Sequence, residues 1–341
     1  MGRKKITIIG LGAASVIVLC ILAASSFYLY HIGIERKTQD LFSQNMQLAQ
    51  TLQLSEQGQA ISVMAAAERS DLAQTETSSQ GWVESQNYET WTVTSGDGLK
   101  LVAYYIPARI STTRTVILAH GYGGQGMEMG QFAKFYAENL GYNVLLPDAR
   151  GHGTSEGDYI GLGWPDRLDY LLWIQKVVDR VGNDSQIALH GLSMGGATVM
   201  MLSGESLPEQ VKVIVEDSGY TSVYDELAYQ LERMYNLPSF PFISATSLLT
   251  DIKAGYNFSE ASSLKQVKKN KTPMLFIHGA SDSFVPVEMV WQLYNACQAE
   301  KQLYLVQGAG HGMAFYADQP DYKMIVSDFI ALFIDSPQVI Y

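Results

Sequence analysis

The hydrophobic and polar positions divide the chain into three stretches. An almost uncharged apolar run extends from Ile6 to Ile34, and a polar stretch rich in Gln, Ser, Ala and Glu follows it. Beyond that stretch, apolar runs recur almost to the C-terminal end. We therefore predict an N-terminal membrane anchor or signal segment over residues 1–37, a partly helical stalk or linker over 38–84, and a globular domain over 85–341.

Short apolar runs in the globular part alternate with longer segments that are compatible with helices. Tyr88–Thr94 and Leu99–Ile106 flank Ser95-Gly96-Asp97-Gly98, a pattern typical of a β-hairpin. Strand followed by helix, repeated several times, predicts a parallel sheet that helices cover on both faces. The further predicted strands are Thr115–Ala119, Tyr142–Leu146, Gln186–His190, Val211–Val215, Met274–Ile277 and Leu303–Val306. Apolar residues at helical spacing, predicted to share one helix face, are Leu168, Leu171, Leu172, Val178 and Val181.

The N-terminal apolar run is long enough to cross a membrane. About 20 apolar residues in a helix span the hydrocarbon core, and Arg3-Lys4-Lys5 precedes the run. The positive-inside rule then places Met1 in the cytoplasm and the globular domain outside, in a single-pass membrane protein. A secreted protein with a cleaved signal peptide is the alternative, because Ala23-Ala24-Ser25-Ser26 offers small residues for cleavage. We favour the uncleaved anchor, since the run exceeds a usual signal sequence.

Charge and composition argue against several classes of partner, nucleic acid first among them. The net charge of −11 and the sequence pI of about 5.0 leave no basic surface for nucleic acid. The 47% hydrophobic content allows a large core. The only cysteines, Cys20 and Cys297, form no disulfide framework. HxxH and HExxH spacings are absent, and we expect neither metal nor cofactor.

The pattern GxSxG occurs twice, at Gly191-Leu192-Ser193-Met194-Gly195 and at Gly153-Thr154-Ser155-Glu156-Gly157. A nucleophile elbow requires a strand before the serine and a helix after it. Ser193 follows the predicted strand Gln186–His190 and precedes a buried apolar segment, whereas Ser155 has neither neighbour. The sequence therefore indicates Ser193 as the nucleophile.

Chemistry-bearing residues recur at the ends of the predicted strands, where parallel sheets place their ligands. They lie in the motifs HGYGG, DARGHGTS, GLSMGG, HGASDSFVP and GAGHGM, in this order. In these motifs the chain resembles the α/β-hydrolase family over roughly Tyr88 to Leu332. The resemblance implies an α/β-hydrolase fold: a mostly parallel eight-stranded sheet, helices on both faces and a small cap between strands 6 and 7. It also implies a nucleophile, an acid and a base in the chain order Ser, Asp, His.

The base and the acid follow from position. Among six histidines, His311 alone comes after the last core strand, in a glycine-rich turn that can place it over the sheet. A serine hydroxyl needs such a base, and the base needs an orienting carboxylate. Asp282 occupies the family's usual position for the acid, and Asp217, at the end of the preceding strand, remains the alternative.

The resemblance also supplies oxyanion donors, namely the backbone N–H groups of Tyr122 and Met194. The side chain of Tyr122 either lines an acyl pocket or packs as an ordinary aromatic residue. Arg150 and His152 are expected to brace loops rather than to contact substrate.

The segment 219–271 exceeds the length that a simple crossover requires. Its apolar residues either cover an acyl pocket as a lid or form the core of a small cap. They are Tyr220, Tyr224, Tyr229, Met234, Tyr235, Phe240, Phe242, Leu248 and Leu249.

These observations predict a serine hydrolase that cleaves small-molecule carboxylic esters through an acyl-enzyme, outside the cell. A serine peptidase, an acyltransferase or a thioesterase would use the same residues. A catalytically silent surface or binding protein on the same fold is the alternative from another class.

Overall fold

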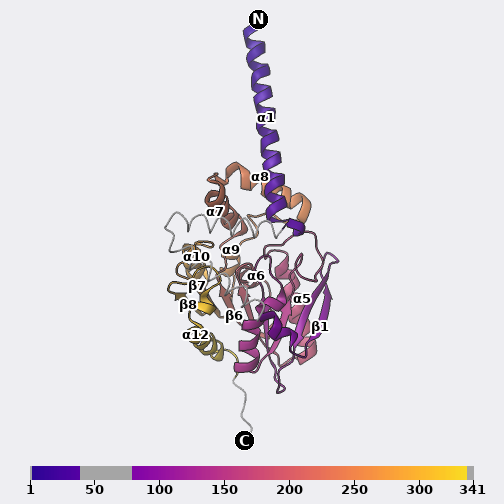
Figure 1. The fold of residues 1–341 in the computed structure, drawn as a ribbon, viewed down its shortest axis with the longest axis vertical. Coiled ribbons are helices and arrows are strands. Elements are labelled where there is room, and N and C mark those ends of the chain that lie inside the picture. Colours follow the sequence, from indigo (N-terminus) through magenta and orange to yellow (C-terminus); the bar gives the residue numbers. More distant parts are fainter. Residues whose placement is uncertain (1, 39–78, 336–341) are drawn as a thin grey trace.

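A computed structural model of the protein describes residues 2–38 and 79–335 (Figure 1). Most of the predicted stalk, residues 39–78, lies outside the described residues. The chain begins with helix α1, Gly2–Gly33, and a short helix, η1, Arg36–Thr38.

The eight strands form one sheet in the order β1-β2-β4-β3-β5-β6-β7-β8. The β1/β2 hairpin is antiparallel and β2 runs antiparallel to β4, whereas all the other neighbouring pairs are parallel. Every predicted strand is present, with ends shifted by at most two residues. The bounds are β1 Glu89–Thr94, β2 Lys100–Ile106, β3 Arg114–Ala119, β4 Asn143–Pro147, β5 Gln186–Leu192, β6 Val211–Asp217, β7 Met274–Gly279 and β8 Lys301–Val306.

Helices cover both faces of this sheet, which explains the continuous apolar strands. Successive side chains point to opposite faces: Val116 and Leu118 of β3 join one core cluster, and Ile117 and Ala119 join the other. The first cluster is closed by η2 Gly126–Met129, α4 Gly130–Lys134, the π-helix η3 Phe135–Asn139, α11 Ala314–Ala317 and α12 Gln319–Ala331. The second is closed by α5 Asp166–Val181, α6 Met194–Leu202, α9 Ser263–Val267 and α10 Val287–Ala296.

Helix α5 corrects one expectation. Leu168, predicted on the apolar face, is 47% exposed, and Leu171 and Leu172 are only partly buried. Val178 of the predicted set is buried, and Leu171 and Val181 pack against the same core cluster. The rest of the buried face carries Tyr170, Trp173, Ile174 and Val177. The prediction for Leu168 was wrong because Tyr170 and Trp173, on the adjacent face of the helix, fill the space above the sheet.

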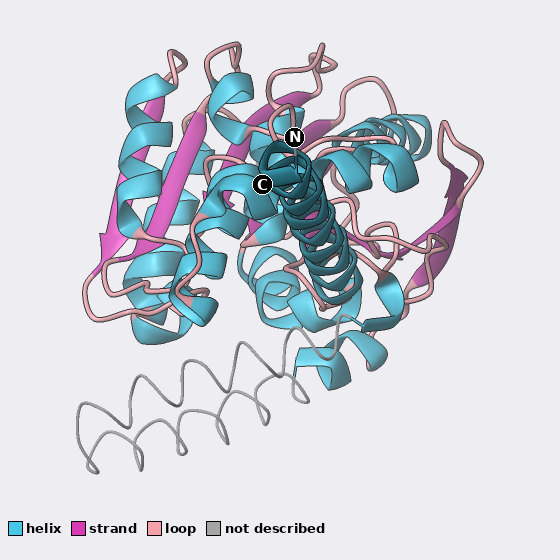
Figure 2. Cartoon of the chain, turned by 90° about the horizontal axis from the view of Figure 1, so that it is seen from above, coloured by secondary structure: helices cyan, strands magenta, loops and turns pink. Residues whose placement is uncertain are grey.

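Between β6 and β7, where the cap was predicted, the chain forms α7 Val223–Tyr235, α8 Ser239–Ala254 and the short α9. We call α7 and α8 the cap. The side chain of Ser222 accepts a hydrogen bond from the Asp225 N–H and begins α7. In Figures 1 and 2 the cap lies at the end of the molecule from which α1 projects.

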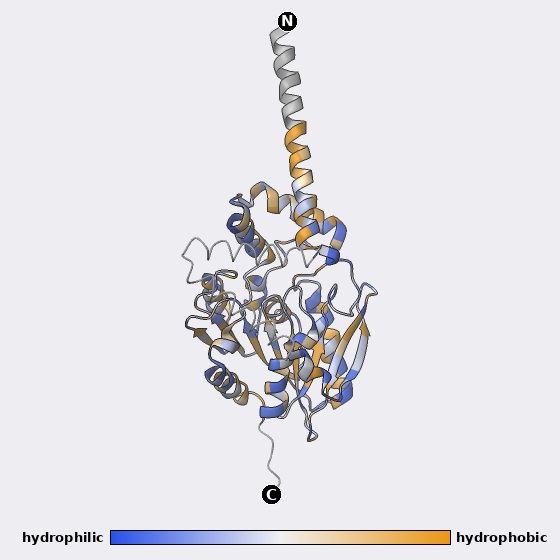
Figure 3. Cartoon of the chain, viewed as in Figure 1, coloured by the Kyte–Doolittle hydropathy of each residue, from blue (hydrophilic) through white to orange (hydrophobic). Residues whose placement is uncertain are grey.

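The C-terminal end of α1 is part of the folded domain. Ile32 and Ile34 are buried, and α1 packs against α8. Just beyond the helix, Arg36 donates hydrogen bonds to the carbonyl oxygens of Gly153 and Ser155, both at 2.7 Å. Val16–Gly33 is apolar enough to cross a membrane by length and composition, and the first turns of this stretch are coloured as hydrophobic in Figure 3.

Candidate active site

Ser193 stands on the sharp turn between β5 and α6. Its backbone adopts φ 57° and ψ −115°, a region that is costly for a residue with a side chain. A Cβ on Gly191 would lie 2.1 Å from the carbonyl oxygen of Gly195, and a Cβ on Gly195 would lie 2.0 Å from that of Ala119. Only glycine fits at both positions, which confirms the expectation of small residues on either side of the serine.

Three of the predicted site residues come together at this turn. The Oγ of Ser193 lies 2.8 Å from Nε2 of His311, and Nδ1 of His311 lies 2.8 Å from Oδ2 of Asp282. Ser193 and His311 are partly accessible, whereas Asp282 is 7% exposed. The ring of Phe284 stacks on the imidazole at a centroid distance of 4.5 Å. The arrangement is a chain of hydrogen bonds from hydroxyl to imidazole to carboxylate.

Asp217, the alternative acid, points elsewhere. Its carboxylate accepts hydrogen bonds from the hydroxyls of Ser218 and Tyr322, at 2.8 and 2.9 Å. Its carbonyl oxygen accepts a hydrogen bond from the N–H of Ser193 at 2.8 Å. Asp217 thus supports the elbow through its backbone, and its side chain pairs with α12.

The carboxylate of Asp282 is held in its charged form. Burial alone would raise its pKa, but the charge of His311 and hydrogen bonds from His278 and His311 outweigh burial and hold the pKa well below its ordinary value. The N–H groups of Phe284 and Val285 donate to its other oxygen at 2.8 and 2.9 Å. This carboxylate is therefore ionised at neutral pH.

His278 is the neighbour that sequence reasoning missed, because it resembled any other histidine that ends a strand. Its Nε2 lies 3.3 Å from Oδ2 of Asp282 and 2.9 Å from the carbonyl oxygen of Val285. Burial by itself would lower the pKa of His278. The hydrogen bond and charge of Asp282 and the charge of Glu216 outweigh burial and raise this pKa from 6.5 to about 9. The signal was present in HGASD, whose histidine and aspartate are four residues apart.

Glu216 is the last residue of this buried group. Burial raises the pKa of its carboxyl from 4.5 to about 8. One oxygen accepts a hydrogen bond from the N–H of Gly219 at 3.0 Å.

This group predicts that stability falls as the pH rises. Between pH 4.5 and about 8 the folded state holds the Glu216 proton and the unfolded state releases it. His278 acts in the same sense between 6.5 and about 9, whereas His120 and His152, which are neutral in the folded state, act in the opposite sense below 6.5 because they bind a proton on unfolding. The free energy of unfolding therefore decreases between pH 6.5 and about 8. We expect the melting temperature of the full chain in detergent to fall over this range.

Glu216→Gln is the matched control, because it keeps an acceptor for Gly219 and cannot ionise. We expect its melting temperature to depend less on pH between 4.5 and 8 than that of the wild type. Identical pH profiles for the two proteins would contradict the raised pKa of Glu216.

The loop after β3 lies against the nucleophile. A Cβ on Gly121 would be 3.5 Å from the Cβ of Ser193. The imidazole of His120 bonds to the carbonyl oxygen of Gly121 at 2.8 Å, and His152 accepts a hydrogen bond from the N–H of Gly123 at 3.3 Å. Burial lowers the pKa of His120, and it lowers that of His152 to about 3, so both rings are neutral braces. The N–H groups of Tyr122 and Met194 stay our predicted oxyanion donors.

The second GxSxG match is structural. Ser155 is buried, donates to the carbonyl oxygen of Asp148 at 2.7 Å and accepts from the N–H of Val102 at 2.9 Å. Nearby, Arg150 forms a buried ion pair with Asp169 at 2.8 Å. As expected, this motif fixes a loop. Within the described ranges, no three His, Cys, Asp or Glu side chains gather as a metal site.

Comparison with known proteins agrees with this geometry. Residues 127–335 match the prolyl oligopeptidase family, Peptidase_S9, over more than half of the chain. The chain belongs to that family. Relatives matched by sequence include the Bacillus subtilis protein YqkD, 26% identical over 75% of this chain and 83% of its own length. The Saccharomyces cerevisiae membrane protein YNL320W is 25% identical over 71% of this chain and 79% of its own length.

Solved structures show the same architecture. The Pyrococcus furiosus esterase Pf2001 aligns with a TM-score of 0.60 and 25% identity, covering 73% of this chain and 92% of the esterase. The predicted α/β-hydrolase fold is therefore confirmed, and the chain is a serine hydrolase of that fold.

Proposed function

We propose that this protein hydrolyses carboxylic esters through an acyl-enzyme on Ser193. The observation that carries the proposal is the hydrogen-bonded series Ser193, His311 and Asp282, at 2.8 Å for each contact. His311 takes the hydroxyl proton as Ser193 attacks the ester carbonyl, and Asp282 orients the ring and stabilises the imidazolium. A complete series of this kind also argues against a catalytically silent protein.

The tetrahedral intermediate carries its negative charge on the former carbonyl oxygen. In the proposal, the N–H groups of Tyr122 and Met194 donate to that oxygen, which lies between the β3 loop and the N-terminus of α6. His311 then protonates the departing alcohol. Water, deprotonated by the same ring, releases the acid and restores the free Ser193 hydroxyl.

An ester fits the surroundings better than a peptide. A pocket between the end of α1 and the cap is lined mostly by aliphatic side chains, with Gln230 and Thr246 as its polar members apart from the hydroxyl of Tyr235. Among the described residues that line it, none is a charged group that would hold a peptide terminus. The Pyrococcus furiosus structure of the same fold is an esterase. Family membership keeps a serine peptidase as the second candidate.

We also propose that α1 stays attached as a single-pass anchor, with Met1 in the cytoplasm and the hydrolase domain outside. The helix is continuous through the small residues Ala23–Ser26. The positive cluster before it supports this orientation, and one relative carries the description membrane protein.

A panel of p-nitrophenyl esters and aminoacyl p-nitroanilides tests the proposal. We expect ester kcat/KM to exceed amide kcat/KM by orders of magnitude, because an alcohol leaves more readily than an amine. Loss of both activities in Ser193→Ala shows that the signal comes from this site. Amide turnover above ester turnover would favour the peptidase instead.

A further inference from the structure

We infer that the substrate is an ester that resides in the lipid bilayer, and that it reaches Ser193 at the membrane surface between the end of α1 and the cap. The inference rests on the proposed esterase function and on the anchor. It adds the class of substrate, an ester with a long apolar chain, and the surface through which it arrives.

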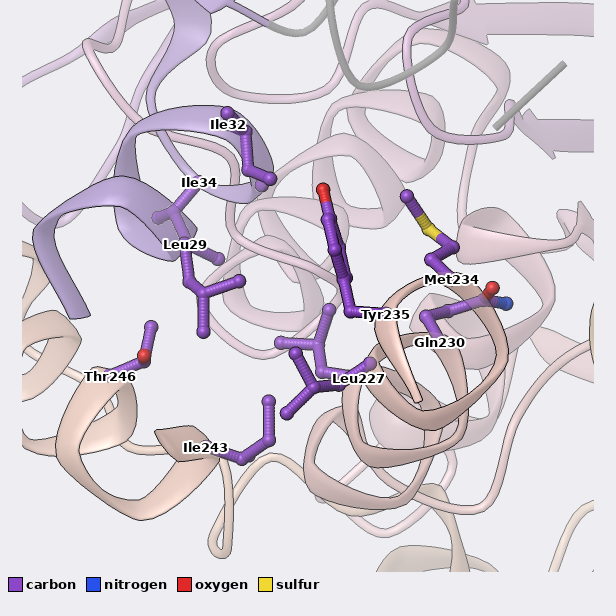
Figure 4. Close-up of a pocket in the computed structure, with 11 residues that line it drawn as sticks. Leu29, Ile32, Ile34, Leu227, Gln230, Met234, Tyr235, Ile243 and Thr246 are labelled. Carbon is purple, nitrogen blue, oxygen red and sulfur yellow. The ribbon is translucent and has the colours of Figure 1, made fainter. Parts of the chain in front are cut away.

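A pocket lies where α1 meets the cap. The space between its lining side chains amounts to about 420 Å³, a volume that includes open solvent. Leu29 comes from the end of α1 and Ile34 directly follows that helix, whereas Leu227 comes from α7 and Ile243 from α8. Figure 4 shows these side chains facing one another. Gly33 also lines the pocket; it is buried, yet a Cβ built on it meets nothing within 4 Å. The pocket is therefore an apolar space whose wall is partly the N-terminal helix.

The wall of this pocket connects to the catalytic residues on two sides. The carbonyl oxygen of Gly33 accepts a hydrogen bond from the hydroxyl of Tyr122 at 3.3 Å. Gln230 donates to the carbonyl oxygen of Phe284 at 2.9 Å, and the Phe284 ring stacks on His311. A chain in the pocket thus lies next to the oxyanion loop and the base.

The cap carries three strongly exposed apolar side chains on α8. Phe240, Leu248 and Ile252 are 73, 62 and 75% exposed. Leu248 and Ile252 lie one turn apart on α8, on the side opposite the buried Ile243 and Thr246. On α1, Phe27 and Tyr28 are exposed by 55 and 50%. Contiguous exposed apolar residues of this kind mark a protein or membrane contact.

The position of this surface along α1 selects the membrane as its occupant. Ile6 to Ser26 already supplies the roughly 20 residues that span a bilayer core. Phe27 and Tyr28 then fall at the interface, where aromatic residues concentrate. The Lys253 amine of α8 lies 5.7 Å from the Phe27 ring and 4.5 Å from that of Tyr30, with Glu35 at 3.4 Å. The cap surface is therefore continuous with the membrane-facing part of α1, at the depth of the lipid headgroups.

The test uses the full chain in phosphatidylcholine vesicles with two substrates: water-soluble p-nitrophenyl acetate, and a long-chain umbelliferyl ester embedded in the vesicles. Leu248→Asp with Ile252→Asp places charge on the cap surface. We expect turnover of the embedded ester to fall about tenfold or more, because buried charge weakens interfacial contact, while acetate turnover is unchanged.

Ile110→Asp is the matched control. Ile110 is 84% exposed and precedes β3, so it lies at the end of the sheet opposite the catalytic loops. We expect it to leave both activities as they are. Gly33→Phe fills the pocket and should lower the ratio of long-chain to acetate turnover, whereas Gly81→Phe, at another glycine with open space, should not.

The outcomes separate the two proposals. If the wild type hydrolyses neither ester, the proposed function fails. If it hydrolyses acetate but not the embedded ester, or if the double aspartate variant matches the wild type on both, the membrane-resident substrate is wrong. A change of the double variant from dimer to monomer in detergent, with embedded-ester turnover retained, would assign the surface to a second copy of the chain.

Discussion

Ser193→Ala is expected to lower kcat for every ester by about 10⁶-fold, because the variant has no hydroxyl to form the acyl-enzyme. What remains is stabilisation of the transition state by the oxyanion donors alone. Folding should be little affected, because Ser193 is partly exposed and, within the described residues, its Oγ forms a hydrogen bond with His311 alone. Steady-state kinetics and labelling by a fluorophosphonate, followed by intact-protein mass, measure the loss.

Ser155→Ala is the control within the same motif. That serine bridges two backbone groups inside the protein, so its loss costs about 1–3 kcal/mol of stability. The Ser155→Ala variant should keep its esterase activity and its labelling by the fluorophosphonate. A labelled Ser193→Ala protein, or an unlabelled but folded Ser155→Ala protein, would show that the nucleophile is misassigned.

Asp282→Asn is expected to lower kcat about 10⁴-fold with little change in KM. The amide offers Nδ1 of His311 no negative charge, and it favours the wrong tautomer of the ring. The variant also removes the charge that His278 faces at 3.3 Å. Kinetics at several pH values measure the effect. We expect part of the activity to return at high pH, where removal of the Ser193 proton depends less on His311.

Asp217→Asn separates the two candidate acids. Its side-chain oxygen can still accept from Tyr322, and its carbonyl oxygen still accepts from the Ser193 N–H. We expect a change of less than about tenfold in kcat. A loss as large as that of Asp282→Asn would make Asp217 the acid and would contradict the hydrogen bond between His311 and Asp282.

Much of the architecture was predictable because local pattern carries it. Parallel strands buried on both faces give uninterrupted apolar runs, such as residues 116–119 of β3, and the turns between them need glycine. The elbow at Ser193 was distinguishable from Ser155 by the elements around it. Strand ends gather at one edge of the sheet, so the order Ser193, Asp282, His311 already indicated a common site.

The sequence by itself determined the alternating strands and helices, the apolar N-terminal run and the preference for Ser193 over Ser155 as the candidate nucleophile, since each depends on neighbours within a few residues. Only the tertiary structure decided that His311 pairs with Asp282 rather than Asp217, and that His278 stands behind that carboxylate. It alone showed that the end of α1 forms a wall of a pocket and contacts Tyr122 of the loop after β3. These are contacts between residues far apart in the chain, and their geometry depends on how the loops and the cap pack over the sheet.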